Sequence, residues 1–258
     1  MSANRNHETV VGGQFGSRAD AYLKSAVHAA GEDLAALVEL VAGRSDAKVL
    51  DLGCGGGHVT FNAAAHAAQV TAYDLSPEML GVVAKAASER GLANVVTQQG
   101  VVEKLPFADG TFDFVLSRFS AHHWQDFGMA LREAARVLKP GGIAGFVDSV
   151  SPGRPLLDTY YQTLEMLRDC SHVRNYSRGE WESAMATAGL VPTTTRHFRL
   201  RLDFASWVER MRTPKVQVEA IRALQQTVSA EASGYFETEP DGSFTFDIGF
   251  FQAAKPAG

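Results

Sequence analysis

The chain has 258 residues, 45% hydrophobic and 21% charged, which is ordinary for a globular protein large enough to bury a substantial core. Its formal net charge of −5 argues against nucleic acid as a partner, because phosphate contacts favour a basic surface. No apolar run approaches the roughly 18 residues that span a bilayer, so we expect no membrane span. The polar N-terminus and the two isolated cysteines favour a cytoplasmic protein with reduced thiols, and they leave a homo-oligomer open.

The N-terminal region divides into two parts. Residues 1–13 are polar and glycine-containing, so we expect them to be disordered, and residues 14–43 favour one or two helices. Four apolar side chains of the second part recur at helical spacing: Leu34, Leu37, Val38 and Val41. Gly43 is then expected to end the helical region.

Strands and helices alternate over residues 44–150. We expect strands at residues 48–53, 69–74, 95–98, 112–117 and 143–148. We expect helices at residues 58–67, 76–91 and 127–138. The second of these begins with Ser76-Pro77-Glu78, in which serine caps the helix and proline takes the first helical position. This alternation predicts a parallel sheet with right-handed crossovers and helices on both faces.

The spacing becomes looser after residue 150. Helices are expected at residues 156–168 and 178–188, and at 204–232 with a break at Pro214; strands are expected at residues 191–202 and 244–254. The whole pattern predicts an α/β, Rossmann-like sheet of seven mostly parallel strands in a single domain spanning residues 1–258. The N-terminal helices and the helices inserted before the last strand are expected to be additions to this sheet.

A glycine loop follows the first strand, in Val49-Leu50-Asp51-Leu52-Gly53-Cys54-Gly55-Gly56-Gly57. Glycines let the backbone turn tightly and approach a nucleotide closely. The dinucleotide pattern G-x-G-x-x-G fails at its third position, because His58 or Thr60 stands there. Asp51 would repel a pyrophosphate but attract an ammonium or sulfonium group. A nicotinamide-dependent oxidoreductase is therefore a weaker alternative.

Asp74 ends the second strand, 21 residues after Gly53. A carboxylate at this place can accept hydrogen bonds from both hydroxyls of a ribose. Such charge-assisted bonds are stronger than neutral ones. The loop and Asp74 together predict a site for a nucleoside.

Five segments, in this order, resemble class I S-adenosylmethionine (AdoMet)-dependent methyltransferases, in particular the group of quinone-biosynthesis C-methyltransferases. They are Asp51-Leu-Gly-Cys-Gly-Gly-Gly, Asp74-Leu-Ser-Pro-Glu-Met79, Gly100-Val-Val-Glu-Lys-Leu-Pro-Phe107, Phe112-Asp-Phe-Val-Leu-Ser117 and Arg136-Val-Leu-Lys-Pro-Gly-Gly142. The resemblance covers roughly residues 14–150. Three further stretches, 120–124, 170–176 and 207–214, are similar to the YafE subgroup.

The resemblance implies roles for residues of the core, 44–150. Asp51 would face the methionine end of AdoMet, and Gly53 and Gly55 would pass beneath its carboxypropyl and ribose portions. Asp74 would hold the ribose hydroxyls, and Ser117 would contribute backbone near the methionine moiety.

The adenine would lie between apolar side chains. The resemblance places Leu75 and Met79 on one side of the ring and Val101 and Val102 on the other. Relatives often carry an acidic residue where Val101 stands, accepting from the adenine amino group. Here that contact must be absent or come from elsewhere.

Methyl transfer needs mainly alignment of the reacting atoms, and a base only where the acceptor must lose a proton. The candidates are His122 and His123, just beyond the fourth strand at the carboxyl edge of the sheet, where open α/β sheets bind ligands. Tyr22, in a helical lid over residues 14–43, is a candidate AdoMet contact, and a plain packing helix is an equal alternative. We expect no metal site and no nucleophilic role for Cys54.

We therefore expect an enzyme that transfers a methyl group from AdoMet to carbon, oxygen or nitrogen of a small organic acceptor, by direct displacement. The acceptor pocket is expected to be built from residues 14–30 and 150–235. Residues 151–258 are expected to form the acceptor-side helices and the last strands. Two alternatives stay open at this point: the oxidoreductase, and an AdoMet-binding protein without catalytic activity.

Overall fold

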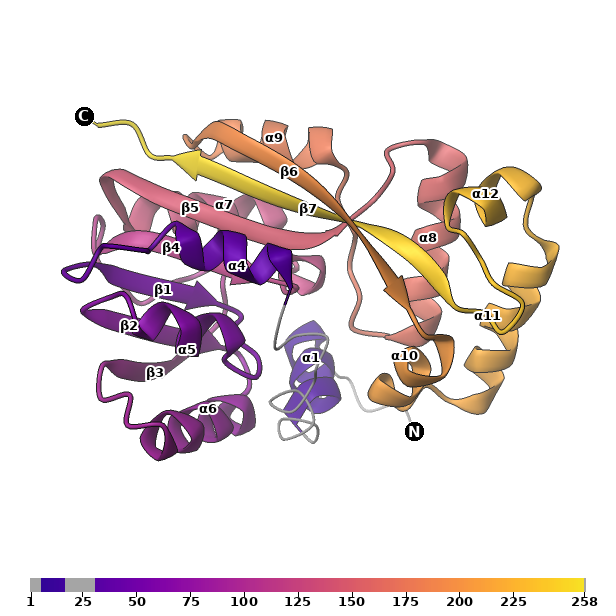
Figure 1. Cartoon of the computed structure of the whole chain (residues 1–258), viewed down its shortest axis with the longest axis horizontal. Coiled ribbons are helices and arrows are strands. Elements are labelled where there is room, and N and C mark those ends of the chain that lie inside the picture. The colour runs from indigo at the N-terminus through magenta and orange to yellow at the C-terminus, as the bar shows by residue number, and fades with distance from the viewer. Residues whose placement is uncertain (1–5, 17–30, 258) are drawn as a thin grey trace.

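A computed structural model of the chain describes residues 6–16 and 31–257. Seven strands form one sheet in the order β3-β2-β1-β4-β5-β7-β6 (Figure 1). The first five strands of this order, from β3 at the edge to β5, pair in parallel. β7 runs antiparallel to both β5 and β6. The predicted Rossmann-like, seven-stranded, mostly parallel sheet is thus confirmed.

The strands match the expected ranges closely at most ends. They are β1 (Lys48–Leu52), β2 (Gln69–Asp74), β3 (Val95–Gln99), β4 (Phe112–Arg118), β5 (Leu138–Val150), β6 (Val191–Leu202) and β7 (Phe244–Ala254). β5 is longer than the predicted 143–148. Its first residue pairs with Phe112 of β4, and its last pairs with Asp247 of the long strand β7.

Helices cover both faces of the sheet. α4 (Glu32–Glu39), α5 (His58–Ala64) and α6 (Pro77–Glu89) pack on one face, and α7 (Phe127–Val137) and α9 (Arg178–Thr187) on the other (Figure 1). Side-chain caps begin several of these helices: Ser76 accepts from Met79 N–H at α6, and Asp126 accepts from Met129 N–H at α7. Each face buries an apolar cluster, one including Leu37, Val49 and Phe114, the other Leu50, Phe146 and Trp181.

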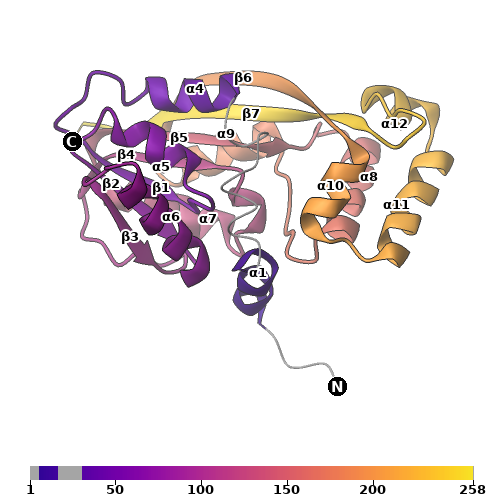
Figure 2. The same ribbon diagram turned by 60° about the horizontal axis from the view of Figure 1, so that its bottom comes forward.

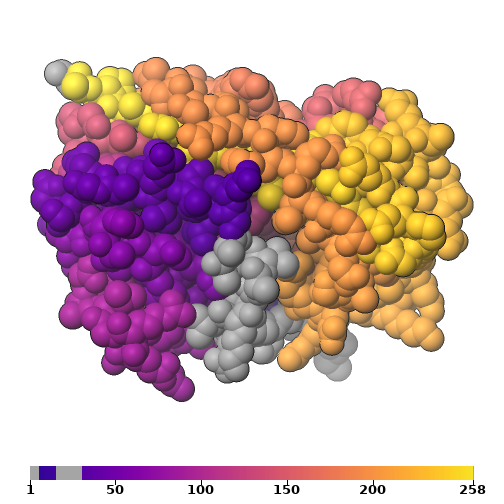
Figure 3. Space-filling model, in the orientation of Figure 1, coloured from indigo at the N-terminus to yellow at the C-terminus, as the bar shows by residue number. Residues whose placement is uncertain are grey.

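A second group of helices lies beyond the ends of β6 and β7. It consists of α8 (Pro155–Arg168), α10 (Phe204–Met211), α11 (Lys215–Thr227) and α12 (Ala230–Tyr235). Figure 2 shows this group standing beside the sheet, Figure 1 shows β6 and β7 running from the sheet to the group, and Figure 3 shows the two parts in contact as packed atoms. The insertion predicted at 204–232 is confirmed as helical, and it consists of three helices that extend to residue 235.

The prediction of disorder for residues 1–13 was wrong for residues 7–13. They lie in helix α1 (His7–Gly16), because Asn6 accepts from Thr9 N–H and the helix rests against the loop after β4. Residues 32–39 are helical as expected, and of the two alternatives for the segment 14–43, a lid or a plain packing helix, they follow the second and pack on the sheet. There, Leu37 and Leu40 lie close above Gly145 of β5, where no side chain stands in their way.

The carboxyl ends of β1, β2 and β4 meet at one edge of the sheet, facing α1 (Figure 2). The glycine loop follows β1, Asp74 ends β2, and the 3-10 turn Ala121–His123 follows β4. This edge gathers the residues that the sequence singled out. None of the described helices is long and apolar enough to cross a membrane.

Candidate functional site

A cavity lies over the glycine loop, with about 1100 Å³ of empty space that partly opens to solvent. We call it the glycine-loop cavity. Eight of the predicted cofactor residues line it: Asp51, Gly53, Gly55, Asp74, Leu75, Met79, Val101 and Val102.

Asp74 shapes the floor of this cavity. Its Oδ2 accepts from Gly55 N–H at 2.9 Å and its Oδ1 from Ser76 N–H at 2.9 Å, so it orders both the glycine loop and the start of α6. Burial raises the pKa of Asp74, and the two backbone N–H groups oppose that rise. Each carboxylate oxygen has a second lone pair, so Asp74 can still accept from a ligand hydroxyl.

Asp51 is 1% exposed, and its Oδ2 accepts from the Thr60 hydroxyl at 2.6 Å. Burial raises the pKa of Asp51 to about 7, with the charge of Asp74 adding to the rise and the bonds from Thr60 opposing it. The buried carboxylate of Asp51 and the half-buried carboxylate of Asp74, both lining the cavity, favour a cationic ligand. This agrees with the preference for a sulfonium or ammonium group inferred from the sequence.

The four side chains predicted to enclose adenine are apolar and line the cavity. Met79 and Val102 are almost fully buried, and Leu75 lies next to Asp74. The carbonyl of Val101 already accepts from the Tyr73 hydroxyl at 3.0 Å. Glu103 also lines the cavity, and its Oε1 accepts from the backbone N–H of Gln125 at 2.9 Å. Glu103 therefore supplies a carboxylate to the cavity wall, which the side chain of Val101 cannot do.

The segment after β4 forms the opposite wall. Ser117 itself is not among the lining residues, because its hydroxyl donates to the Leu52 carbonyl at 2.7 Å and it is 2% exposed. The next residues, Arg118, Phe119 and Ser120, line the cavity instead. Phe119 has φ 52°, a conformation that costs energy for a residue with a side chain and that is typical of functional sites.

Helix α1 forms the cover of the cavity through His7, Glu8, Val11 and Phe15. One ring nitrogen of His7 lies 3.0 Å from the His123 carbonyl, and the ring of Phe15 meets that of His123 edge-on, with centroids 4.9 Å apart. Tyr22, the other predicted contact of the N-terminal segment, lies outside the described residues. Its role stays a prediction.

A second cavity, with about 620 Å³ of empty space, lies between the carboxyl edge of the sheet and helices α8 and α10. We call it the helix-side cavity. It shares three lining residues with the glycine-loop cavity: Phe15, Phe119 and His123. Its remaining apolar lining comes from Leu200, Leu202, Trp207, Met211 and Phe246, and its polar lining from His122, Ser149, Glu165, Arg168, Asp169 and Arg210.

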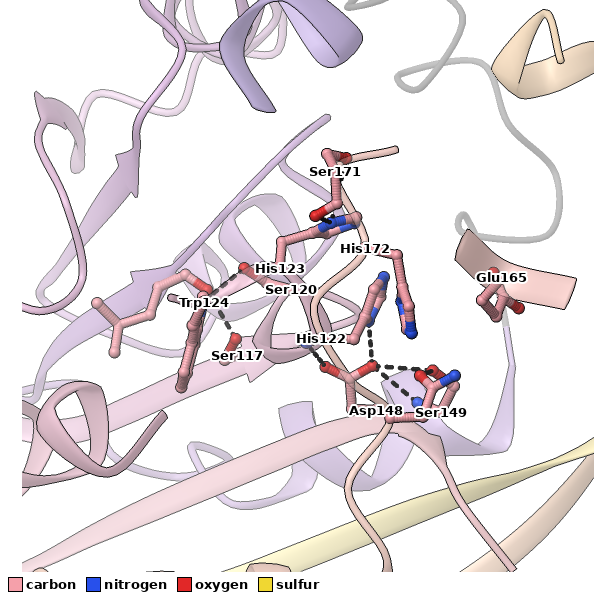
Figure 4. A network of polar contacts seen from close by, with 12 residues as sticks. Ser117, Ser120, His122, His123, Trp124, Asp148, Ser149, Glu165, Ser171 and His172 are labelled. Carbon is pink, nitrogen blue, oxygen red and sulfur yellow. Dashed lines mark hydrogen bonds and ion pairs between the residues drawn. The ribbon is translucent and has the colours of Figure 1, made fainter. Parts of the chain in front are cut away.

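The two candidate bases, His122 and His123, differ in their surroundings (Figure 4). Nδ1 of His122 lies 2.5 Å from Oδ1 of Asp148 on β5. A carboxylate only accepts, so Nδ1 carries the proton and Nε2 has a lone pair. Burial lowers the pKa of His122, but the charge and hydrogen bond of Asp148 outweigh it, and the pKa lies above its ordinary value.

His123 lies at the boundary of the two cavities. Its Nδ1 donates to the Ser171 carbonyl at 3.0 Å, and burial together with the neighbouring His122 lowers its pKa to about 4. It is therefore neutral near pH 7 and a weak base. The sequence placed both rings at the sheet edge but could not distinguish them, because Asp148 and Ser171 are distant in the chain.

Sequence reasoning missed several residues of this site. Asp148 ends the predicted fifth strand without any local signal, and Glu165, Arg168 and Trp207 lie on helices whose inward faces are known only from the fold. Burial raises the pKa of the Cys54 thiol well above its ordinary value, which makes it a poor nucleophile. Within residues 6–16 and 31–257, no group of three or more His, Cys, Asp or Glu could hold a metal ion.

The residues present fit AdoMet. The carboxylates of Asp51 and Asp74 suit its cationic end and its ribose, apolar side chains suit adenine, and the open space beside Gly55 admits a ligand close to the backbone. A glycine loop after β1, an acidic residue ending β2 and this strand order together define a class: nucleoside-binding transferases of the Rossmann-like type.

Comparisons with known proteins agree with this assignment. A family model described as a methyltransferase domain matches residues 50–146. The uncharacterized protein YafE of Escherichia coli is 52% identical over 201 residues, covering 78% of this chain and 97% of YafE. The uncharacterized methyltransferase YcgJ of Bacillus subtilis is 36% identical over 222 residues, covering 86% and 88% of the two chains.

Solved structures show the same fold. The crystal structure of YcgJ superposes with a TM-score of 0.84 at 33% identity, covering 88% of this chain and 99% of that one. A second crystal structure, of a Bacillus halodurans protein titled a putative methyltransferase, also gives 0.84, at 30% identity, with 88% and 100% coverage. This chain belongs to the family of AdoMet-dependent methyltransferases, and AdoMet is its methyl donor.

Proposed function

We propose that the protein transfers the methyl group of AdoMet to a small organic acceptor by direct displacement, with AdoMet in the glycine-loop cavity and the acceptor in the helix-side cavity. The observation that supports this most is the shared boundary: Phe15, Phe119 and His123 line both cavities. Direct displacement needs donor and acceptor in contact along one line, and two adjoining cavities provide that arrangement.

The predicted residues have distinct tasks in this proposal. Asp74 accepts from the ribose hydroxyls, and Asp51 faces the cationic end of the donor. Leu75, Met79, Val101 and Val102 enclose the adenine. AdoMet supplies an already activated methyl group, so the protein contributes mainly binding and orientation.

The acceptor is proposed to be small, and nucleic acid is not proposed. The helix-side cavity is bounded by α8, α10, β6 and β7, and the net charge of the chain is −5. A concave cavity that combines apolar side chains with a few polar groups is typical of small-molecule sites, whereas nucleic acid requires an extended basic surface.

Calorimetric titration separates this proposal from the oxidoreductase alternative. AdoMet and S-adenosylhomocysteine should bind, and NAD⁺ should not. The protein would then be incubated with methyl-labelled AdoMet and the small molecules of a cell extract. Transfer of the label to one of these molecules would exclude the alternative of an AdoMet-binding protein without catalytic activity. Binding of NAD⁺ but not AdoMet would contradict the proposal.

A further inference from the structure

We propose that the helix-side cavity accepts a neutral, mainly apolar molecule with an acidic O–H group, of the phenol or enol type, and that Nε2 of His122, held by Asp148, removes its proton. This inference rests on the proposed function and adds to it the acceptor class and the base. Two observations carry it: the charge balance of the cavity and the geometry of His122.

The helix-side cavity offers no net formal charge to an acceptor. Glu165 pairs with Arg168 at 3.3 Å, and the remaining charged lining residues are Asp169 and Arg210. The two carboxylates and two guanidinium groups cancel in formal charge. A strongly anionic or cationic acceptor would lose its hydration here without a matching net charge.

Seven of the fourteen residues that line the helix-side cavity are apolar. Besides Phe15, they are Phe119, Leu200, Leu202, Trp207, Met211 and Phe246. Burial of apolar surface against them stabilises a bound apolar molecule. His122 and Ser149 are polar lining residues of this same cavity, so the acceptor's polar group would lie toward them.

Asp148 fixes the orientation of His122. It accepts from the His122 ring at 2.5 Å, from His122 N–H at 3.3 Å and from Ser149 N–H at 2.8 Å. No residue of the described ranges hydrogen-bonds to Nε2 of His122 in the structure, and His122 lines the cavity. In Figure 4 the ring lies above Asp148 with His172 beside it.

Other titratable and charged groups also surround His122. They are Asp148 on β5, Glu165 and Arg168 on α8, Asp169 and His172 in the following loop, and the adjacent His123. Burial lowers the pKa of His172 to about 2, so it is neutral like His123. The carboxylates of Asp148, Glu165 and Asp169 stabilise the protonated form of His122, whereas the other two rings stay neutral. His122 is therefore the strongest base of the three histidines.

The chemistry of an imidazole limits the acceptor class. A base that titrates near neutral pH can take a proton from a phenol or enol, but hardly from an alkyl alcohol. The proton leaves oxygen for Nε2, and the electron pair left on the acceptor forms the bond to the methyl carbon. The pair of the broken S–C bond stays on sulfur. The positive charge thus moves from sulfur to His122, beside Asp148.

The test uses 4-nitrophenol as a probe, because its phenolate absorbs visible light and reports proton removal without turnover. The protein is first saturated with S-adenosylhomocysteine. The probe is then titrated at a pH at which the free probe is mostly protonated, and its methyl ether, 4-nitroanisole, serves as the probe without a proton. We expect both to bind and the bound phenol to show the phenolate band.

The variants assign the effect to residues. His122→Ala and Asp148→Asn should lower the ratio of phenolate to phenol in the bound probe by at least about tenfold, which corresponds to ~1.4 kcal/mol. Binding of 4-nitroanisole should stay unchanged in both variants. Leu200→Trp fills the cavity and should weaken binding of both probes at least about tenfold. Val191→Trp, at an exposed position of the same strand, is the matched control and should leave both unchanged.

Binding of S-adenosylhomocysteine shows that each variant is folded. If Leu200→Trp no longer binds S-adenosylhomocysteine, Leu200→Phe is used in its place. If the wild type binds S-adenosylhomocysteine but not 4-nitrophenol, or if His122→Ala leaves the phenolate ratio unchanged, the inference is overturned and the proposed function stands. If the wild type binds neither AdoMet nor S-adenosylhomocysteine, the proposed function fails and the inference fails with it.

Discussion

At the residue scale, Asp74 orders the glycine loop, and the proposed function gives it a second task, accepting hydrogen bonds from the ribose of AdoMet. We expect Asp74→Asn to weaken AdoMet binding by at least about tenfold, because a charge-assisted hydrogen bond contributes roughly 1.5–3 kcal/mol. The amide keeps an acceptor oxygen for one of the two N–H groups of Gly55 and Ser76, so the fold should survive. Calorimetry measures the affinity, and a thermal melt provides the control. A folded variant with unchanged affinity would remove Asp74 from the site.

Asp51 predicts a proton linkage. Its pKa is about 7 in the free protein, so it is mostly protonated at pH 6. A cationic ligand beside it favours the ionised form, which lowers this pKa on binding and releases a proton. AdoMet affinity should therefore rise with pH up to about 7 and level off above it. Titrations at pH 6 in buffers of different ionisation enthalpy would detect the released proton, and Asp51→Asn should abolish the release.

The two histidines predict different kinetic effects once an acceptor is known. His122→Ala should lower kcat by ~10²–10⁴-fold with AdoMet binding intact, while His123→Ala should have a smaller effect, because its low pKa makes it a weak base. The wild-type rate should fall on acidification as His122 becomes protonated. That fall should begin above pH 6.5, since Asp148 raises this pKa. Near-normal kcat in His122→Ala would contradict its role as base.

At the scale of elements, the turn between β1 and α5 depends on Gly53. Its φ is 65°, and a Cβ there would lie 1.8 Å from the Ser120 hydroxyl, which accepts from Trp124 Nε1–H at 3.1 Å. Gly53→Ala should destabilise the protein by roughly 1–2 kcal/mol for the backbone alone, and by more through the clash. It should also weaken AdoMet binding.

Gly81 provides the matched control for this substitution. It lies in α6 with nothing within 4 Å of an added Cβ. Gly81→Ala should therefore stabilise the protein by roughly 0.5–1 kcal/mol and leave AdoMet binding unchanged. Denaturant unfolding compares the two variants, and equal stability in both would show that the left-handed turn at Gly53 is not needed.

Local patterns predicted most of the elements and most of the named residues that line the glycine-loop cavity. Apolar strands, glycine stops and the Ser76-Pro77 start are short-range signals, and Asp51 and Asp74 follow directly from their places at strand ends. Helix α1 was missed because Gly12 and Gly13 argue against a helix locally. Its contacts with His123 are made 116 residues away in the chain.

The helix-side cavity and the His122–Asp148 pair depend on contacts between residues that are far apart in the sequence. Asp148 lies 26 residues after His122, and Trp207 and Phe246 reach the cavity only because β6 and β7 carry the second group of helices to that edge. A single sequence predicts which face of each element is apolar, but not which of those faces meet. The acceptor side was therefore predicted as a region and not as named residues.

At the scale of the whole molecule, the central claim is that the two cavities hold donor and acceptor in line. A crystal structure with S-adenosylhomocysteine tests it most directly. We predict ribose hydroxyls on the Asp74 carboxylate, adenine between Met79 and Val102, and the sulfur facing Phe119 and His123 at the boundary of the helix-side cavity. A nucleoside bound elsewhere, or a sulfur turned away from that boundary, would contradict the account.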